Sequence, residues 1–276
     1  MIWKTRRQTL DLKRDAVVMG ILNATPDSFS DGGKYSFAHD ALERALEMVK
    51  EGAKIIDIGG ESTRPGAGSV DAAEEIARTV PIIKKLRSRS DVLISIDTSK
   101  VAVAEAAIDA GADIVNDVTG LRDEGMVQLC VSAGVGVCVM HMQGEPRTMQ
   151  KNPSYESEGG VLPAIQAFFA ERLASLQSSG MHTDCICFDP GIGFGKTHEH
   201  NLDLLRCVGE LQTSRPVLLG VSRKSVVGRL TGEHDPEQRD GATAVITALA
   251  CKSGIQLHRV HDVKSVVEAI RIAQLV

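Results

Sequence analysis

The stretch VLISIDTSKVAVAEAAIDAGADIV, residues 92–115, contains one full repeat of the pattern that decides the fold. It opens with an apolar, β-branched run that ends at Asp97, and it closes with a second such run, Ile114–Val115. Between the two runs, Val101–Ala110 has apolar residues at helical spacing, and Gly111 suits the left-handed position that ends a helix. Apolar strands that alternate with amphipathic helices indicate a parallel sheet covered by helices.

The same alternation extends over the whole chain. The expected strands are Val17–Leu22, Ile55–Ile58, Val92–Ile96, Ile114–Val115, Gly136–Met140, Cys185–Phe188, Pro216–Val221 and Ile255–Val260. The expected helices are Ala38–Glu51, Ala72–Leu86, Val101–Ala110, Glu124–Ala133, Gly160–Leu176, Leu202–Glu210, Gly241–Ala250 and Val263–Leu275. Eight such units favour a closed (β/α)8 TIM barrel, with an open doubly wound sheet as the alternative. We expect a single domain over residues 1–276, in which 1–15 form a short N-terminal lead-in.

Composition narrows the classes of function. The chain has 276 residues, of which 43% are hydrophobic and 24% charged, as is ordinary for a globular protein. A net charge of −5 and an aromatic content of 3% argue against nucleic acid as a partner. No apolar run is long enough to cross a bilayer, so no membrane association is expected. The six cysteines form no CxxC pair and are expected to be reduced, buried thiols of a cytoplasmic protein.

Polar residues stand at or just after the end of every expected strand. They are Asn23, Asp57, Asp97, Asn116, Asp117, His141, Asp189, Ser222, Arg223, Lys224, Arg259 and His261. A single Asp in such a place is usually a helix cap or a turn residue. Caps alone do not require Asn, His, Arg and Lys there, and the carboxyl ends of barrel strands converge on one face. This face is therefore the expected active site.

The glycine-rich stretch DPGIGFGKT, residues 189–197, resembles two nucleotide-binding motifs without matching either. A Walker A loop needs glycine where Pro190 stands, and the glycines do not have G-x-G-x-x-G spacing. We interpret the stretch as a tight loop that lets Asp189 and the backbone approach a flat ligand, with Lys196 as a solvated loop cation. His198 and His200 lack zinc-ligand spacing and are expected near a helix start in solvent.

Several long motifs closely resemble those of bacterial dihydropteroate synthases. They are MGILNATPDSFSDGG (19–33), DIGGESTRPGA (57–67), SIDTSK (95–100), NDVTG (116–120), MHMQGEPRTMQ (140–150), FDPGIGFGK (188–196), GVSRKS (220–225) and RVHDV (259–263). The resemblance runs from the first expected strand to the last. It implies a TIM barrel, commonly a cytoplasmic homodimer and a sulfonamide target, which serves folate biosynthesis. The implied reaction joins p-aminobenzoate to 6-hydroxymethyl-7,8-dihydropterin diphosphate and releases diphosphate.

The resemblance also implies a role for individual residues. The implied pterin contacts are Asp97, Asn116, Met140, Asp189 and Lys224. The implied diphosphate contacts are Asn23, Arg64, Arg259 and His261, with Asn23 also a contact for the cofactor Mg2+. The implied p-aminobenzoate contacts are Phe29, Thr63, Pro65, Phe194 and Ser222. Asp97, Asp189, Lys224 and Arg259 are the implied catalytic residues.

Other classes of protein share parts of this pattern. A pterin-binding methyltransferase domain of a folate–corrinoid system would share the pterin contacts but would not need a diphosphate clamp such as Arg64 and Arg259. A pterin-binding pseudoenzyme would be expected to lose at least one of the charged site residues. We further expect the pterin diphosphate to bind first and to order the loops at residues 23–36 and 60–69, which completes the second slot.

Overall fold

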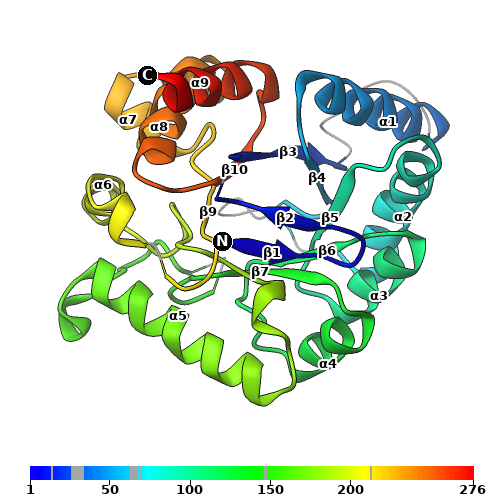
Figure 1. Ribbon diagram of the computed structural model, residues 1–276, viewed down its shortest axis with the longest axis horizontal. Helices are drawn as coiled ribbons and strands as arrows, with labels where there is room; N and C mark the ends of the chain where they lie inside the picture. The colour runs from blue at the N-terminus through cyan, green and yellow to red at the C-terminus, as the bar shows by residue number, and fades with distance from the viewer. Residues whose placement is uncertain (14, 26–33, 63–67, 69, 146–147, 212) are drawn as a thin grey trace.

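The computed structural model describes residues 1–13, 15–25, 34–62, 68, 70–145, 148–211 and 213–276. Within this part of the chain, a ring of parallel strands is surrounded by helices (Figure 1). The strands of the ring are β3 (Val17–Asn23), β4 (Ile55–Gly59), β5 (Leu93–Asp97), β6 (Ile114–Asp117), β7 (Gly136–Met140), β8 (Ile186–Asp189), β9 (Leu218–Leu219) and β10 (Leu257–Val260).

The order of the strands shows that the sheet closes on itself. Hydrogen-bonded neighbours run β8-β7-β6-β5-β4-β3-β10-β9. The ring closes between β8 and β9, where the Phe188 N–H donates to the Pro216 carbonyl at 2.9 Å and Phe188 forms a parallel bridge with Val217. An open doubly wound sheet would leave two edge strands, so this closure excludes that alternative and confirms the TIM barrel.

The helices follow the expected order. They are α1 (Lys34–Glu51), α2 (Ala72–Arg89), α3 (Val101–Ala110), α4 (Glu124–Ala133), α5 (Val161–Ser178), α6 (His198–Arg206), α7 (Ser225–Thr231), α8 (Asp240–Lys252) and α9 (Val263–Leu275). Short 3₁₀ helices lie at Glu156–Glu158, Thr183–Cys185, Val208–Leu211 and Pro236–Arg239. Of the helices in the described ranges, none is long and apolar enough to cross a membrane.

Local capping explains why several helix bounds were predictable. The carboxylates of Asp123 and Asp262 accept hydrogen bonds from the Met126 and Ser265 N–H groups and so start α4 and α9. Gly111 ends α3 with a φ of 115°, in the left-handed region that favours glycine. The short helix α7 was not among the helices expected from periodicity, because seven residues are too few to show a helical period.

The N-terminal lead-in contains a β-hairpin that was not predicted from the sequence. Strand β1 (Ile2–Lys4) pairs antiparallel with β2 (Thr9–Asp11), and the hairpin lies across the middle of the barrel (Figure 1). Trp3 is fully buried, and its indole N–H donates to the Cys185 carbonyl at 2.9 Å. Trp3 also packs into the cluster of apolar side chains at the strand starts, which includes Met19 and Ile55. The hairpin therefore closes the amino-terminal end of the barrel.

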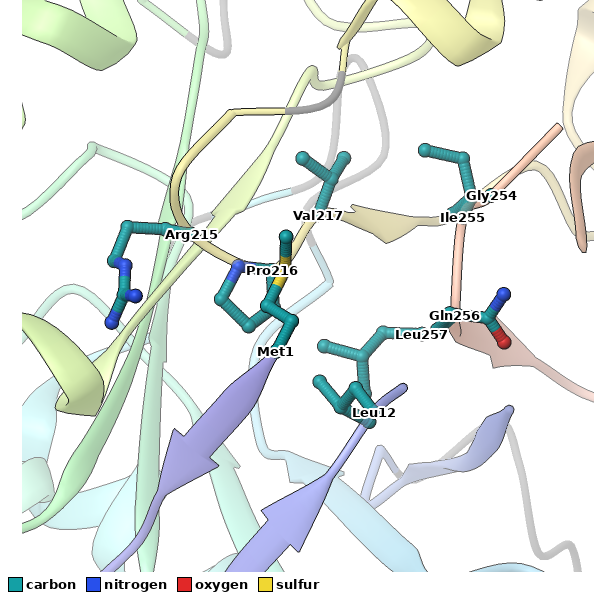
Figure 2. Close-up of a pocket in the computed structure, with 9 residues that line it drawn as sticks. All are labelled: Met1, Leu12, Arg215, Pro216, Val217, Gly254, Ile255, Gln256 and Leu257. Atoms are coloured by element: carbon teal, nitrogen blue, oxygen red, sulfur yellow. The ribbon is translucent and has the colours of Figure 1, made fainter. Parts of the chain in front are cut away.

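A small hollow remains at this closed end (Figure 2). Met1 and Leu12 from the hairpin line it together with Pro216, Val217 and Leu257, near the starts of β9 and β10. Active sites of such barrels lie at the carboxyl ends of the strands. The hollow is at the opposite end and is therefore separate from the expected site.

Candidate active site

A connected group of polar side chains lies at the carboxyl ends of four strands. Arg259 donates from Nε to Asp57 Oδ2 at 2.6 Å and from Nη2 to Asp97 Oδ2 at 2.7 Å. The Asn116 amide donates to the same Asp57 oxygen at 3.2 Å. Asp97 of β5 and Asn116 of β6 are register partners, whereas Asp57 of β4 lies beside Ser95 and Arg259 of β10 lies beside Met19. The Arg259 side chain therefore bridges residues of different register to connect the group. Asp57 thus links the predicted site residues Arg259 and Asn116, and Arg259 in turn links Asp97.

Asp57 is a member of the site that the sequence left without a role. It lies in the middle of β4 and is fully inaccessible to solvent. The sequence showed an acid inside an apolar strand, which is a costly placement unless a cation compensates it. Its partner Arg259 is distant in sequence, so only the barrel reveals the pair.

Two acceptor oxygens of this group have no partner among the described residues. They are Oδ1 of Asp97 and Oδ1 of Asp57, and both are buried. A buried acceptor without a donor is costly, so such atoms point to a donor supplied by a ligand or by water. The mouth of the barrel, at its carboxyl end, therefore has two buried acceptors that an N–H donor would satisfy.

Asp189 and Lys224 form a second charged pair in the mouth. An added Cβ at Gly220 would lie 3.8 Å from Asp189 Oδ2, 3.8 Å from Lys224 Nζ and 3.9 Å from Arg259 Cβ. The Lys224 ammonium also donates to the Ile192 carbonyl at 2.6 Å, and Asp189 accepts from the Gly191 N–H at 2.6 Å. The absence of a side chain at Gly220 leaves room in which these groups converge.

Burial shifts the protonation equilibria of the site. It raises the pKa of Asp97 to about 7, although Arg259 opposes this shift. Burial also raises the pKa of Asp189, against the opposing charge of Lys224. Burial lowers the pKa of Lys224 to about 8, against the opposing charge of Asp189. For Arg259, burial disfavours the charge, but Asp57 and Asp97 raise its pKa above the ordinary value.

An apolar surface adjoins the charged groups. Met140, Met142 and Met149 pack with Val118, and the Phe194 ring packs against them. The Lys224 ammonium lies 4.8 Å from the centroid of the Phe194 ring. Two predicted contacts, Met140 and Phe194, therefore supply apolar surface beside the charged group, as a flat ring requires.

The glycine-rich loop after β8 is as tight as predicted. Gly191, Gly193 and Gly195 all have positive φ, at 66°, 86° and 61°. An added Cβ at Gly191 would lie 1.9 Å from the His141 carbonyl oxygen, so only glycine fits there. The loop thereby packs directly on the segment that follows β7.

The prediction for Lys196 was wrong. This side chain is only 3% exposed, and its ammonium lies 3.0 Å from His141 Nδ1 and donates to the Phe194 carbonyl at 3.0 Å. The glycines turn the loop back onto the barrel, so that residue 196 points inward. Burial lowers the pKa of Lys196 to about 7 and that of His141 to about 3. The pair holds the Phe194 segment in place.

His198 and His200 are also less exposed than expected. Both are half-buried in the first turn of α6. Thr197 and His200 form a reciprocal capping box, and the His200 ring packs edge-on against Tyr155. No group of three histidine, cysteine or acidic side chains suited to holding a metal occurs in the described part of the chain.

The remaining predicted residues divide into two groups. Asn23 ends β3 and is half-buried, while Ser222 Oγ lies 2.9 Å from His261 Nδ1 and accepts from the His261 N–H at 3.1 Å. Phe29, Thr63, Arg64 and Pro65 lie outside the described residues, as does most of the two loops that we expect the diphosphate to order. Helix α7 begins at Ser225, so Ser222 is three residues upstream of the helix start.

Comparison with known proteins agrees with this geometry. Residues 19–261 match the family described as "Pterin binding enzyme". The chain therefore belongs to the pterin-binding enzymes, a class that fits a TIM barrel with buried acceptors at its mouth.

Relatives narrow the family further. A dihydropteroate synthase of Escherichia coli (strain K12) is 42% identical over 96% of this chain and 93% of its own length. A crystal structure of Yersinia pestis dihydropteroate synthase with a sulfonamide drug complex has a TM-score of 0.92 at 43% identity, covering 100% of this chain and 98% of that one. A Xanthomonas albilineans dihydropteroate synthase in complex with 7,8-dihydropteroate has a TM-score of 0.89 at 36% identity, covering 100% and 98%. Within the pterin-binding enzymes, this chain belongs to the dihydropteroate synthases.

Proposed function

We propose that this chain joins p-aminobenzoate to 6-hydroxymethyl-7,8-dihydropterin diphosphate, which gives 7,8-dihydropteroate and diphosphate. The observation that carries the proposal is the pair of buried carboxylate oxygens on Asp57 and Asp97, at the carboxyl end of a barrel of this family, that have no hydrogen-bond partner among the described residues. A pterin ring presents N3–H and a 2-amino group on one edge. Those donors match acceptors that the described part of the chain leaves unsatisfied.

The charged pair at Gly220 holds the other part of the ring. Asp189 accepts from ring N–H groups, and Lys224 donates to ring oxygen and nitrogen acceptors. The apolar surface of Met140 supports the flat face of the pterin ring, and Phe194 beside it contacts p-aminobenzoate. As the bond between C6-methylene and diphosphate oxygen breaks, positive charge develops on the pterin methylene, and Asp97 and Asp189 stabilise that charge.

Cations stabilise the negative charge of the leaving diphosphate. Arg259 both neutralises the acids of the pterin site and binds the diphosphate. Its guanidinium is held by Asp57 and Asp97, so it neutralises the acids that bind the pterin. It is half-buried at the mouth and presents its remaining N–H groups to the diphosphate. His261 and Arg64 are proposed to complete the clamp. The neutral amine nitrogen of p-aminobenzoate forms a bond to the pterin methylene carbon, in place of the broken C–O bond, and then releases one proton to water, so no strong general base is required.

Mg2+ fits this site only as an ion that the diphosphate shares. The described residues lack a cluster of acids able to hold a metal alone, and Asn23 offers a single neutral oxygen. Mg2+ keeps most of its waters and accepts one or two protein oxygens beside phosphate oxygens, so this donor set is sufficient. When bound, the ion neutralises charge on the departing diphosphate.

One assay tests the reaction. Diphosphate release is measured with both substrates and Mg2+, and then with each of the three left out. We expect release only in the complete mixture, and we expect Asp97→Asn to lose most of it. Asp203→Asn is the matched control, because Asp203 lies exposed on α6 and, among the described residues, forms its ion pair with Arg206 at 3.0 Å. Release that does not depend on p-aminobenzoate would refute the proposal.

The exposed face of α8 and α9 is proposed to bind a second copy of the chain. Val245 and Leu249 lie one turn apart on α8 and are 60% and 62% exposed, and Ile272 on the neighbouring α9 is 63% exposed. A homodimer would cover these side chains. Sedimentation is expected to give a dimer for the unaltered chain and a monomer for Leu249→Glu, and a monomer in both cases would refute this part of the proposal.

A further inference from the structure

Arg223 adopts a backbone conformation that its side chain disfavours. Its φ is 61°, and Leu121 is the other non-glycine residue with positive φ in the described ranges. The left-handed region brings Cβ close to the backbone and is costly for a bulky residue. Such strain persists only where surrounding contacts hold it, and it is concentrated at functional sites. Arg223 lies between two predicted site residues, Ser222 and Lys224.

A group of hydrogen bonds holds Arg223 in this conformation. Its guanidinium donates to both oxygens of Asp240, from Nε at 2.8 Å and from Nη2 at 2.6 Å. Such a two-point pair fixes the direction of the side chain. Arg239 donates from Nη1 to the Arg223 carbonyl at 2.9 Å and from Nε to the Glu233 carbonyl at 3.0 Å. The Arg239 guanidinium also packs on α7, where an added Cβ at Gly228 would lie 2.6 Å from it.

The left-handed turn explains how the residues on either side both reach the site. Arg223 points outward to Asp240, at the start of α8. The chain then turns so that Ser222 meets His261, and Lys224 meets the Ile192 carbonyl beside Asp189. Another backbone conformation at residue 223 would redirect Lys224, since a side chain's direction follows the preceding dihedral angles.

We propose that Arg223 is a positioning residue: its ion pair with Asp240 holds the left-handed turn that places the Lys224 ammonium beside Asp189 for the pterin. The inference rests on the proposed synthase function. It assigns no contact with substrate to Arg223, whose guanidinium is occupied by Asp240.

Two substitutions distinguish the effect of the backbone conformation at residue 223 from the effect of losing the ion pair. Arg223→Ala removes the ion pair and leaves a residue that disfavours positive φ, whereas Arg223→Gly removes the same pair but adopts positive φ freely. We expect Arg223→Ala to lower kcat/KM about 10- to 100-fold, because a small displacement of a catalytic group has effects of that size. Arg223→Gly should retain several-fold more activity than Arg223→Ala. Arg215→Ala is the control, since Arg215 pairs with Asp184 at 2.5 Å at the closed end of the barrel.

A double-mutant cycle then tests whether Arg223 acts through Lys224. Binding of 6-hydroxymethylpterin is measured by calorimetry for Arg223→Ala, Lys224→Met and the double variant, with thermal unfolding recorded for each. We expect Arg223→Ala to weaken binding in the native background and to have almost no effect beside Lys224→Met. Equal losses in both backgrounds, or equal activity of the Ala and Gly variants, would overturn the inference. Failure of the unaltered chain to release diphosphate would instead overturn the proposed function.

Discussion

The two ends of the barrel are built from the same strands but meet different demands. At the amino-terminal end, Trp3 of the hairpin packs against an apolar layer, with a single buried hydrogen bond from its indole. At the carboxyl end, Asp57, Asp97 and Arg259 occupy the equivalent interior space. Burial of apolar surface at the amino-terminal end stabilises the folded protein. Burial of charged groups at the carboxyl end is costly, and that stabilisation offsets the cost. Stability and chemistry are thus separated along the barrel axis.

Trp3→Ala should have the largest effect on stability. It removes a fully buried indole and leaves the Cys185 carbonyl without its donor. We expect a loss of about 3–5 kcal/mol in the free energy of unfolding, with kcat/KM unchanged at low temperature. Urea unfolding measures the first and a diphosphate-release assay the second. Lys4→Ala, an exposed neighbour in β1, is the control and should change little. A fall in kcat/KM for folded Trp3→Ala would show that the ends are coupled.

Arg259→Met should lower both the free energy of unfolding and kcat. Removing the guanidinium leaves Asp57 and Asp97 as buried acids without their cation, which costs about 3 kcal/mol of stability. It also removes a group that binds the leaving diphosphate, so kcat should fall further than the affinity for pterin. Arg206→Met is the control for loss of an arginine, because Arg206 is exposed and its ion pair among the described residues is with the exposed Asp203. If kcat and unfolding are both unchanged, the ion pairs of Arg259 have no role.

Asp189→Asn should weaken the binding of pterin. The substitution keeps the shape but removes the charge that faces Lys224, so we expect pterin affinity to fall by about 2–3 kcal/mol, the cost of losing one charged hydrogen-bonding partner. Calorimetry with 6-hydroxymethylpterin gives the value. Stability should change less than in Trp3→Ala. Unchanged affinity would remove Asp189 from the pterin site.

The smallest expected effect is a dependence of pterin affinity on pH. Asp97 must be ionised to accept two donors, and its pKa of about 7 predicts that affinity falls below that pH. Lys224 must be charged, and its pKa of about 8 predicts a second fall above that pH. Each limb should approach about tenfold per pH unit. Asp97→Asn should remove the acidic limb and leave the alkaline limb, and a profile that is flat from pH 6 to 9 would contradict both assignments.

Local sequence determined much of the architecture. The alternation of apolar runs and amphipathic segments located the barrel strands, and Asp123, Asp262 and Gly111 marked helix ends by interactions within a few residues. The long motifs placed the site at the strand ends. None of these signals requires knowledge of distant contacts, which is why they could be read directly.

Tertiary structure alone decided the contacts between distant residues. Trp3 meets Cys185, Arg259 meets Asp57, and Lys196 turns inward to His141, each across a sequence separation that no local pattern encodes. Lys196 looked like a surface residue because lysine usually is one, and only the glycine turns and the packing around them bury it. The sequence by itself determined where strands, helices and polar ends lie, whereas closure of the barrel determined which charges neutralise one another.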